Sequence, residues 1–217
     1  MENRSESTAR TGCQLYLISP PAIDDGFAER LKTGLSAGPI AAFQLRLKGI
    51  SEDEIARLAE PLQRICAEFD TAFIINDSVA LAQRLGADGV HLGQGDGDAK
   101  AARALLGPSV QIGVTCHNSR HLAMEAGENG ADYVAFGAFY ETGTKQTEVI
   151  AEKDILTWWN GLFELPCVAI GGITPATAPE LALAGADFVA VSGAVWNNPK
   201  GEAAAVRAFA EVLNLNG

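Results

Sequence analysis

Three segments of the sequence repeat one short pattern: 86–90 GADGV, 130–134 GADYV and 185–189 GADFV. In each segment a glycine and a polar Ala-Asp turn lead into the start of an apolar run. A glycine at this place is typical of a helix that ends in the left-handed conformation, and the apolar run is typical of a buried parallel strand. The repeat therefore predicts a scaffold in which helices alternate with buried strands.

The same alternation continues over the rest of the chain. Short runs typical of strands occupy residues 14–19, 41–46, 72–76, 89–92, 110–114, 133–137, 167–171 and 188–192, with helical patterns between them. One helical pattern begins at Ser51, three residues before Glu54, which is typical of a capping box. Eight such units without a break in composition predict a single (β/α)8 TIM barrel over residues 13–217. A doubly wound open sheet needs the same alternation and stays an alternative at this stage.

Composition limits the classes of function. The chain has 217 residues, of which 47% are hydrophobic, and a formal net charge of -11. This length is enough for one sizeable core, and the negative charge argues against nucleic acid or an anionic membrane as a partner. Residues 1–12 are polar, carry charges of both signs and are expected to form a flexible N-terminal tail rather than a signal peptide.

The four cysteines, Cys13, Cys66, Cys116 and Cys167, stand singly among apolar neighbours. This spacing suits neither a metal site nor a disulfide framework. We therefore expect a cytoplasmic protein with reduced thiols that acts on small molecules. The sequence leaves open whether the protein forms a homo-oligomer.

Polar side chains follow the second predicted strand, in 44–48 QLRLK. Because side chains alternate along a strand, Gln44, Arg46 and Lys48 share one face, and the two leucines share the other. The carboxyl ends of barrel strands form the active site in this fold, so we expect an amide and two cations at the barrel mouth. A diphosphate would match these groups, although Arg46 and Lys48 could also lie past the strand end in solvent.

Two carboxylates follow the next two strands. Asp77 comes directly after Asn76 at the end of the third strand, and Asp96 follows the fourth. Two separated carboxylates on neighbouring strand ends can hold one Mg²⁺ while leaving positions for water and phosphate oxygens. The alternative interpretation is that both aspartates are helix N-caps.

The last three strands end in loops suited to a phosphate. Residues 142–145 TGTK supply two hydroxyls and a cation, 171–172 is a Gly-Gly pair, and 192–193 is Ser-Gly. Glycines let the backbone approach an anion closely, and the ends of strands seven and eight are the usual phosphate site of these barrels. A tight turn without any ligand is the alternative.

Seven motifs occur in a fixed order: 44–48 QLRLK, 75–77 IND, 89–96 GVHLGQGD, 112–117 IGVTCH, 133–145 YVAFGAFYETGTK, 168–174 VAIGGIT and 189–193 VAVSG. Each motif alone is weak, but the ordered set resembles the thiamine-phosphate synthase family over residues 14–196.

The resemblance implies a transferase of thiamine biosynthesis. It would join 4-amino-2-methyl-5-pyrimidinylmethyl diphosphate to thiazole phosphate with Mg²⁺ and release pyrophosphate, by ionisation at the pyrimidine methylene followed by attack of the thiazole nitrogen. The residues implied for the pyrimidine diphosphate are Gln44, Arg46, Lys48, Asn76 and Lys145, with Asp77 and Asp96 on Mg²⁺. Those implied for the thiazole phosphate are Thr142, Thr144, Gly171, Gly172, Ser192 and Gly193. The groups expected to act on the reacting atoms are Arg46, Lys48, Thr115 and Lys145.

Two features depart from the family pattern. Thr115 stands where the family usually has serine, and 137–141 GAFYE replaces the common Gly-Pro-Ile-Phe-Pro. The loss of two prolines puts the rigidity of this loop in doubt, and Glu141 brings a negative charge near an anion site.

Two other functions stay open at this point. The resemblance extends to a thiazole tautomerase, an isomerase that shares the phosphate site but needs neither a diphosphate site nor Mg²⁺, and in which His117 would carry the proton. A barrel that binds a phosphorylated ligand without catalysis would keep only the glycine-rich ends. Gln44, Lys48 and the pair Gln94 and Asp96 favour the synthase, because neither alternative requires them.

Overall fold

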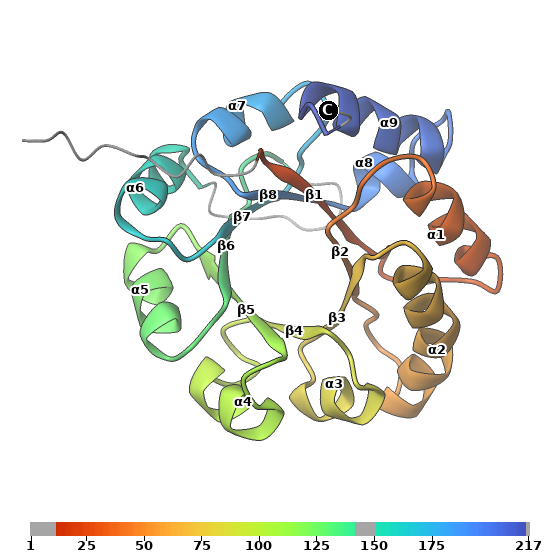
Figure 1. The fold of residues 1–217 in the computed structure, drawn as a ribbon, viewed down its shortest axis with the longest axis horizontal. Helices are drawn as coiled ribbons and strands as arrows, with labels where there is room; N and C mark the ends of the chain where they lie inside the picture. The colour runs from red at the N-terminus through yellow and green to blue at the C-terminus, as the bar shows by residue number, and fades with distance from the viewer. Residues whose placement is uncertain (1–11, 142–150, 216–217) are drawn as a thin grey trace, which may run out of the picture.

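The strands form a closed barrel. The structure, a computed structural model, describes residues 12–141 and 151–215. Eight parallel strands pair in sequence order, and β1 also pairs with β8, which closes the ring. The helices lie around the outside of this ring (Figure 1). The predicted TIM barrel is confirmed, and the alternative of an open, doubly wound sheet is wrong.

The strands match the predicted ranges to within one residue at every end except one. They are β1 Gln14–Ile18, β2 Ala42–Leu45, β3 Ala72–Asn76, β4 Gly89–Leu92, β5 Gln111–His117, β6 Tyr133–Gly137, β7 Cys167–Ile170 and β8 Phe188–Val191. The exception is β5, which continues to His117, with a shift of register against β6 between Thr115 and His117. Such a shift changes the direction of the side chains at a strand end, and here it falls on a candidate site residue.

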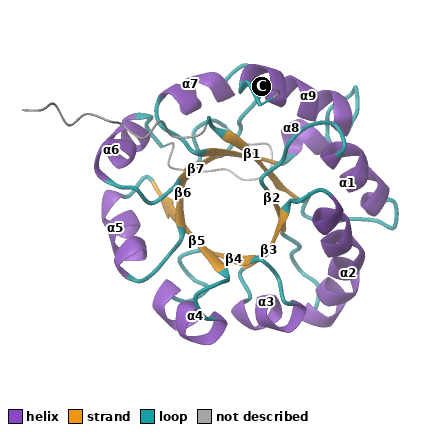
Figure 2. Cartoon of the chain, in the orientation of Figure 1, coloured by secondary structure: helices purple, strands orange, loops and turns teal. Residues whose placement is uncertain are grey.

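The helices fill the connections between strands (Figure 2). They are α1 Phe27–Leu35, α2 Glu52–Glu68, α3 Val79–Leu85, α4 Ala99–Leu106, α5 Arg120–Glu128, α6 Asp154–Leu162, α7 Ala178–Leu183, α8 Gly193–Trp196 and α9 Glu202–Val212. Ser51 caps α2 as predicted, because its side chain accepts the backbone N–H of Glu54 at 3.3 Å. The Glu54 carboxylate instead accepts from Arg57 at 2.7 Å, so only half of the capping box forms.

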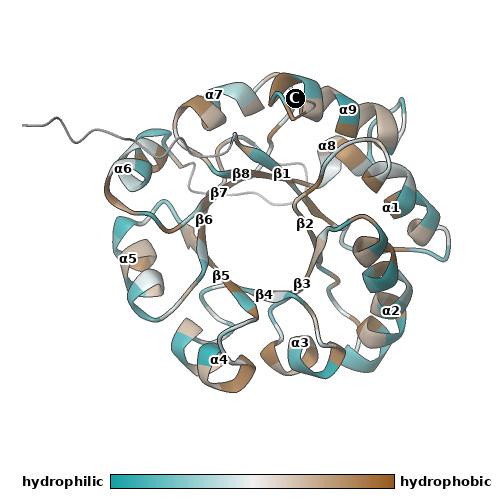
Figure 3. Cartoon of the chain, in the orientation of Figure 1, coloured by the Kyte–Doolittle hydropathy of each residue, from teal (hydrophilic) through white to brown (hydrophobic). Residues whose placement is uncertain are grey.

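Buried side chains form two layers. The larger core lies between the barrel and the helices and includes Phe43, Leu62 and Trp159. The smaller core, which includes Tyr16 and Ile74, comes from the alternate strand positions that face the barrel axis. Hydrophobic stretches accordingly follow the strands and parts of the surrounding helices (Figure 3).

The remaining predictions about the whole chain concern its termini and cysteines. Of the predicted tail, residues 1–12, only Gly12 lies among the described residues. Within the described ranges, no helix is long and apolar enough to cross a membrane. All four cysteines are buried, and burial raises the pKa of Cys13, Cys66 and Cys116 to about 12. These three thiols are therefore unreactive structural groups.

The aspartates of the three Gly-Ala-Asp segments connect β4 to β3, β6 to β5 and β8 to β7. The Asp132 carboxylate accepts the backbone N–H of Ile112 at 2.7 Å, and the Asp132 N–H donates to the Ile112 carbonyl at 2.7 Å. The same double contact, with distances of 2.7–3.0 Å, joins Asp88 to Phe73 and Asp187 to Cys167. The glycine was predicted to end its helix in the left-handed conformation, and Gly86 does so with φ 58° and ψ 41°.

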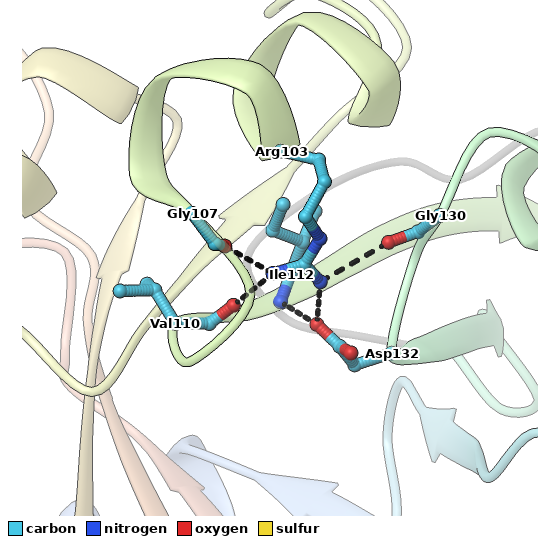
Figure 4. Close-up of polar contacts among 6 residues, drawn as sticks. All are labelled: Arg103, Gly107, Val110, Ile112, Gly130 and Asp132. Atoms are coloured by element: carbon cyan, nitrogen blue, oxygen red, sulfur yellow. Dashed lines mark hydrogen bonds and ion pairs between the residues drawn. The ribbon is translucent and has the colours of Figure 1, made fainter.

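One of these aspartates is also held by an arginine (Figure 4). Arg103, near the end of α4, pairs with the Asp132 carboxylate. The same guanidinium donates to the carbonyls of Gly107 at 2.7 Å, Val110 at 2.8 Å and Gly130 at 3.1 Å. A single cation therefore ties together the ends of α4 and α5 and the starts of β5 and β6.

We predict that Asp132→Ala lowers the free energy of unfolding by about 2–3 kcal/mol, because the Ile112 N–H and the half-buried Arg103 both lose an acceptor. Urea denaturation checks this. The control is Glu60→Ala, which removes an exposed carboxylate 3.9 Å from Arg64 and should cost less than about 0.5 kcal/mol. Equal losses in the two variants would contradict the structural role of Asp132.

Candidate active site

A cavity of about 90 Å³ opens among the carboxyl halves of the strands. Its walls include four residues predicted from the sequence: Gln44, Arg46, Asn76 and Thr115. The other lining residues are Tyr16, Ile18, His91, Ala135, Val168, Ile170 and Ala190. The barrel therefore brings the amide of Gln44 on β2, the guanidinium of Arg46 directly after β2, the amide of Asn76 on β3 and the hydroxyl of Thr115 on β5 into one space.

The strand alternation predicted for 44–48 QLRLK is present. Leu45 and Leu47 are buried among the apolar residues of the outer core, while Gln44 and Arg46 line the cavity. Lys48 lies three residues past the end of β2, and its side chain is half exposed. It is not simply solvated, because its ammonium forms an ion pair with the Asp77 carboxylate.

Neither predicted metal ligand serves as an N-cap. The cap of α3 is Ser78, whose side chain accepts the Leu81 N–H at 3.1 Å, and the cap of α4 is Asp98. Asp77 instead adopts a left-handed backbone with φ 67°, a conformation that is costly for a residue other than glycine and frequent at functional sites. The N-cap interpretation of Asp77 and Asp96 is therefore wrong.

Asp77 and Asp96 lie in the turns that follow two adjacent strands. The Asp77 N–H donates to the His91 carbonyl on β4 at 2.8 Å. The Asp96 carboxylate accepts the Gly93 N–H at 3.0 Å within the turn after β4. Among the described residues, no group of three or more His, Cys, Asp or Glu side chains forms a metal cage.

A row of hydrogen-bonded polar side chains borders the cavity. Gln44 Nε2 lies 2.9 Å from Tyr16 Oη, which is 3.0 Å from Tyr133 Oη. Tyr133 Oη is 3.1 Å from Nδ1 of His91, and the His91 Nε2 is 2.8 Å from Thr115 Oγ1. The row joins five strands, β2, β1, β6, β4 and β5.

Sequence reasoning missed the two tyrosines of this row and left His91 without a role. A usable signal was the alternation itself. Tyr16 and Tyr133 occupy axis-facing positions in the smaller core, whose other buried members are alanine, isoleucine and valine. A phenol there needs a hydrogen-bond partner inside the barrel.

Glycine makes room for one tyrosine. A Cβ atom added at Gly113 would lie 2.0 Å from the Tyr133 ring, closer than any real contact. Gly113 and Tyr133 face each other across the β5–β6 pair. The Tyr133 phenol therefore reaches His91 because β5 carries no side chain at this position.

The ends of β7 and β8 have the expected glycines, and packing accounts for part of their presence. A Cβ at Gly171 would lie 2.3 Å from that of Ala138, and a Cβ at Gly172 would lie 2.5 Å from the Glu141 carbonyl oxygen. Both glycines have positive φ, 102° and 65°. The glycine pair thus leaves room for residues 138–141 to pack against the end of β7. This packing requires glycine there whether or not a phosphate binds.

Ser192 precedes α8 and makes no capping hydrogen bond to the described N–H groups of that helix. Its hydroxyl donates instead to the Ser19 carbonyl at 3.1 Å. The Ser192 side chain therefore ties the end of β8 to the segment after β1.

The altered loop after β6 is attached at its beginning. The N–H groups of Phe139 and Tyr140 donate to the carbonyls of Ile170 and Gly171, each at 3.1 Å. The Tyr140 hydroxyl donates to the Glu180 carboxylate on α7. Hydrogen bonds to β7 and α7 therefore fix the start of this loop, although both family prolines are missing. The predicted site residues Thr142, Thr144 and Lys145 lie outside the described residues.

His117 does not join the cavity. It is exposed at the end of β5, has φ 53° and is absent from the cavity lining described above. The placement gives no support to a proton-transfer role for His117, which was the basis of the tautomerase alternative.

The fold and the site define a class: an enzyme with a TIM barrel whose strand ends present cations, amides and hydroxyls to an anionic small molecule. Residues 15–195 match the family model described as thiamine monophosphate synthase. The chain belongs to this family. Its activity is that of a thiamine-phosphate synthase, an enzyme of thiamine biosynthesis.

Individual relatives are similar to this chain over nearly its whole length. The thiamine-phosphate synthase of Erythrobacter litoralis is 61% identical over 204 residues, covering 92% of this chain and 95% of the relative. That of Rhodospirillum centenum is 56% identical over 204 residues, covering 94% and 99%. Among solved structures, the thiamine phosphate pyrophosphorylase of Pyrococcus furiosus has a TM-score of 0.81 at 28% identity, with 93% and 95% of the two chains covered.

Stability should fall in acid because of His91. Burial lowers the pKa of His91 to about 4 in the folded protein, while the unfolded chain has a histidine pKa of about 6.5. Below pH 6.5 the unfolded state therefore binds a proton that the folded state does not, and stability is lost until the pH approaches 4. Between pH 7 and pH 5 this group should remove about 2 kcal/mol from the free energy of unfolding.

Urea denaturation of the wild type and His91→Gln at both pH values tests this prediction. The variant should lose about 2 kcal/mol less than the wild type over the same interval. Parallel losses would show that His91 does not titrate as a buried group.

Proposed function

We propose that the enzyme joins the pyrimidine diphosphate to thiazole phosphate, with Mg²⁺, and releases pyrophosphate. The observation that carries the proposal is the grouping of Gln44, Arg46, Asn76 and Thr115 around one cavity, next to the Lys48–Asp77 pair. Two cations and two amides suit a diphosphate, and this set has no purpose in a barrel that binds only a monophosphate.

The chemistry proposed for this site needs little acid or base from the protein. The C–O bond between the pyrimidine methylene and the diphosphate breaks, and the electron pair leaves with pyrophosphate. The amino-pyrimidine delocalises the positive charge, and the thiazole nitrogen then forms the new C–N bond. Arg46 and Lys48 would stabilise the departing charge, while Gln44 and Asn76 would orient the pyrimidine diphosphate.

The residues present fit Mg²⁺. This ion is usually held by one or two carboxylates together with substrate phosphates and water, so a cage of three protein ligands is not required. Asp77 and Asp96 provide two carboxylates in adjacent turns, and neither carboxylate caps a helix. When bound, Mg²⁺ would neutralise charge on the leaving diphosphate.

The second substrate would bind at the opposite side of the mouth. In this assignment the thiazole phosphate contacts Gly171, Gly172, Ser192 and Gly193, with Thr142 and Thr144 from the adjoining loop, and Lys145 reaches the pyrimidine diphosphate. The uncapped start of α8 supports the part at Ser192. We place the reaction in the cytoplasm, which the spacing of the four cysteines, singly among apolar neighbours, supports.

We predict that Lys48→Ala and Asp77→Ala each reduce kcat/KM for coupling by about 100-fold or more, because each removes a group that acts on the leaving diphosphate. The assay follows thiamine phosphate and pyrophosphate from the two substrates, with and without a chelator. The matched control is Lys32→Ala, which removes an exposed lysine 3.1 Å from Glu68 on the outer surface. Its turnover should stay within about twofold of the wild type.

Circular dichroism and the urea midpoint establish that each variant is folded. Near-normal turnover in folded Lys48→Ala or Asp77→Ala would contradict the diphosphate and magnesium assignments. Turnover that survives the chelator would contradict the requirement for Mg²⁺.

A further inference from the structure

The row of side chains from Gln44 to Thr115 has a direction. An amide nitrogen can only donate, so the hydrogen bond between Gln44 Nε2 and Tyr16 Oη uses a hydrogen of Gln44. Either phenol could donate in the contact between Tyr16 and Tyr133, and the His91 ring can donate or accept. The arrangement that uses both hydroxyl hydrogens inside the row has Tyr16 donate to Tyr133 and Tyr133 donate to Nδ1 of His91. In this arrangement each member donates to the next, away from Gln44.

The direction fixes the tautomer of His91. Because Nδ1 accepts from Tyr133, a neutral imidazole must carry its hydrogen on Nε2. Nε2 then donates to Thr115 Oγ1 at 2.8 Å. The Thr115 oxygen is an acceptor in this contact, so its own hydroxyl hydrogen is not used in the row.

The protonation states of the two tyrosines agree with this assignment of hydrogens. Burial raises the pKa of Tyr16 to about 12 and raises that of Tyr133 well above its usual value. At neutral pH both phenols of the row therefore keep their hydroxyl hydrogens.

The end of the row lies at the cavity. Thr115 lines the cavity, and the described residues include no second hydrogen-bond partner for its hydroxyl. Tyr16 and His91 also line it, while the Tyr133 side chain sits against Gly113 beside them. The free hydrogen of Thr115 is thus next to the space in which the substrate would bind.

We propose that Tyr16, Tyr133 and His91 are positioning residues that hold Thr115 with its hydroxyl hydrogen directed to an acceptor atom of the bound substrate. The identity of this substrate rests on the proposed function, but the direction of the row does not. Tyr16 acts on Thr115 only through two intermediate side chains, and it therefore offers a test without direct contact to the threonine.

The first experiment is ¹⁵N NMR of the histidine rings in the wild-type protein, without substrate, at pH 7.5. The exposed His117 and His121 are assigned with His117→Asn and His121→Asn, which leaves the signals of His91. Hydrogen on Nε2 is expected. Hydrogen on Nδ1 would mean that His91 donates to Tyr133 and that Thr115 donates to His91, which would overturn the proposal.

The second experiment compares Tyr16→Phe with a matched control. Thr71→Val removes another buried hydroxyl, which donates to the Ile40 carbonyl at 3.0 Å just before β3, at the opposite end of the barrel. Tyr16→Phe leaves Tyr133 free to accept from His91, so the Nδ1 tautomer should become populated. The kcat/KM for coupling should fall by about tenfold, the equivalent of one lost hydrogen bond.

Thr71→Val should lose similar stability but keep the wild-type tautomer and kinetics. If Tyr16→Phe behaves like Thr71→Val in both measurements, the row does not position Thr115 and the proposal fails. The tautomer is measured without substrate, so failure of the coupling assay would count against the proposed function and leave the tautomer result standing.

Discussion

The aspartate of each Gly-Ala-Asp turn holds one residue of the preceding strand by both its N–H and its carbonyl. A parallel sheet has no hairpins to set its register, so long connections would leave the start of each strand poorly defined. The three contacts fix β4 against β3, β6 against β5 and β8 against β7. Once the amino ends are aligned in this way, the carboxyl ends of all the strands meet at one mouth.

This division separates stability from function along the barrel axis. At the amino end, the Asp132 carboxylate and the Arg103 guanidinium bond to backbone groups and to each other. At the carboxyl end, Arg46 and Asn76 face a cavity. The polar groups at the mouth can point to this cavity because the register is secured at the other end of the strands.

The sequence predicted the barrel well because strand and helix signals are local. It also predicted Gln44, Arg46, Asn76 and Thr115 in one site, since strand ends must converge in this fold. It failed on two kinds of feature. The alternative that Asp77 and Asp96 cap helices was wrong because Ser78 and Asp98, one or two residues further on, are equally good caps. The polar row was missed because Tyr16 and Tyr133 are 117 residues apart, and only closure of the barrel brings them together.

The Lys48–Asp77 pair bears on how a chain of net charge -11 could bind an anion. In the free protein the two side chains neutralise each other, so neither is an uncompensated charge at the barrel mouth. A magnesium diphosphate would offer each side chain a new partner, the cation for Asp77 and the phosphate for Lys48. The local charge would then change little on binding, because Mg²⁺ cancels most of the charge of the diphosphate. The unfavourable field of the whole protein would act on a substrate whose charge is largely cancelled. Under the proposed function, a diphosphate without the metal would be repelled by the negative charge of Asp77. Metal and diphosphate are therefore expected to bind as one unit.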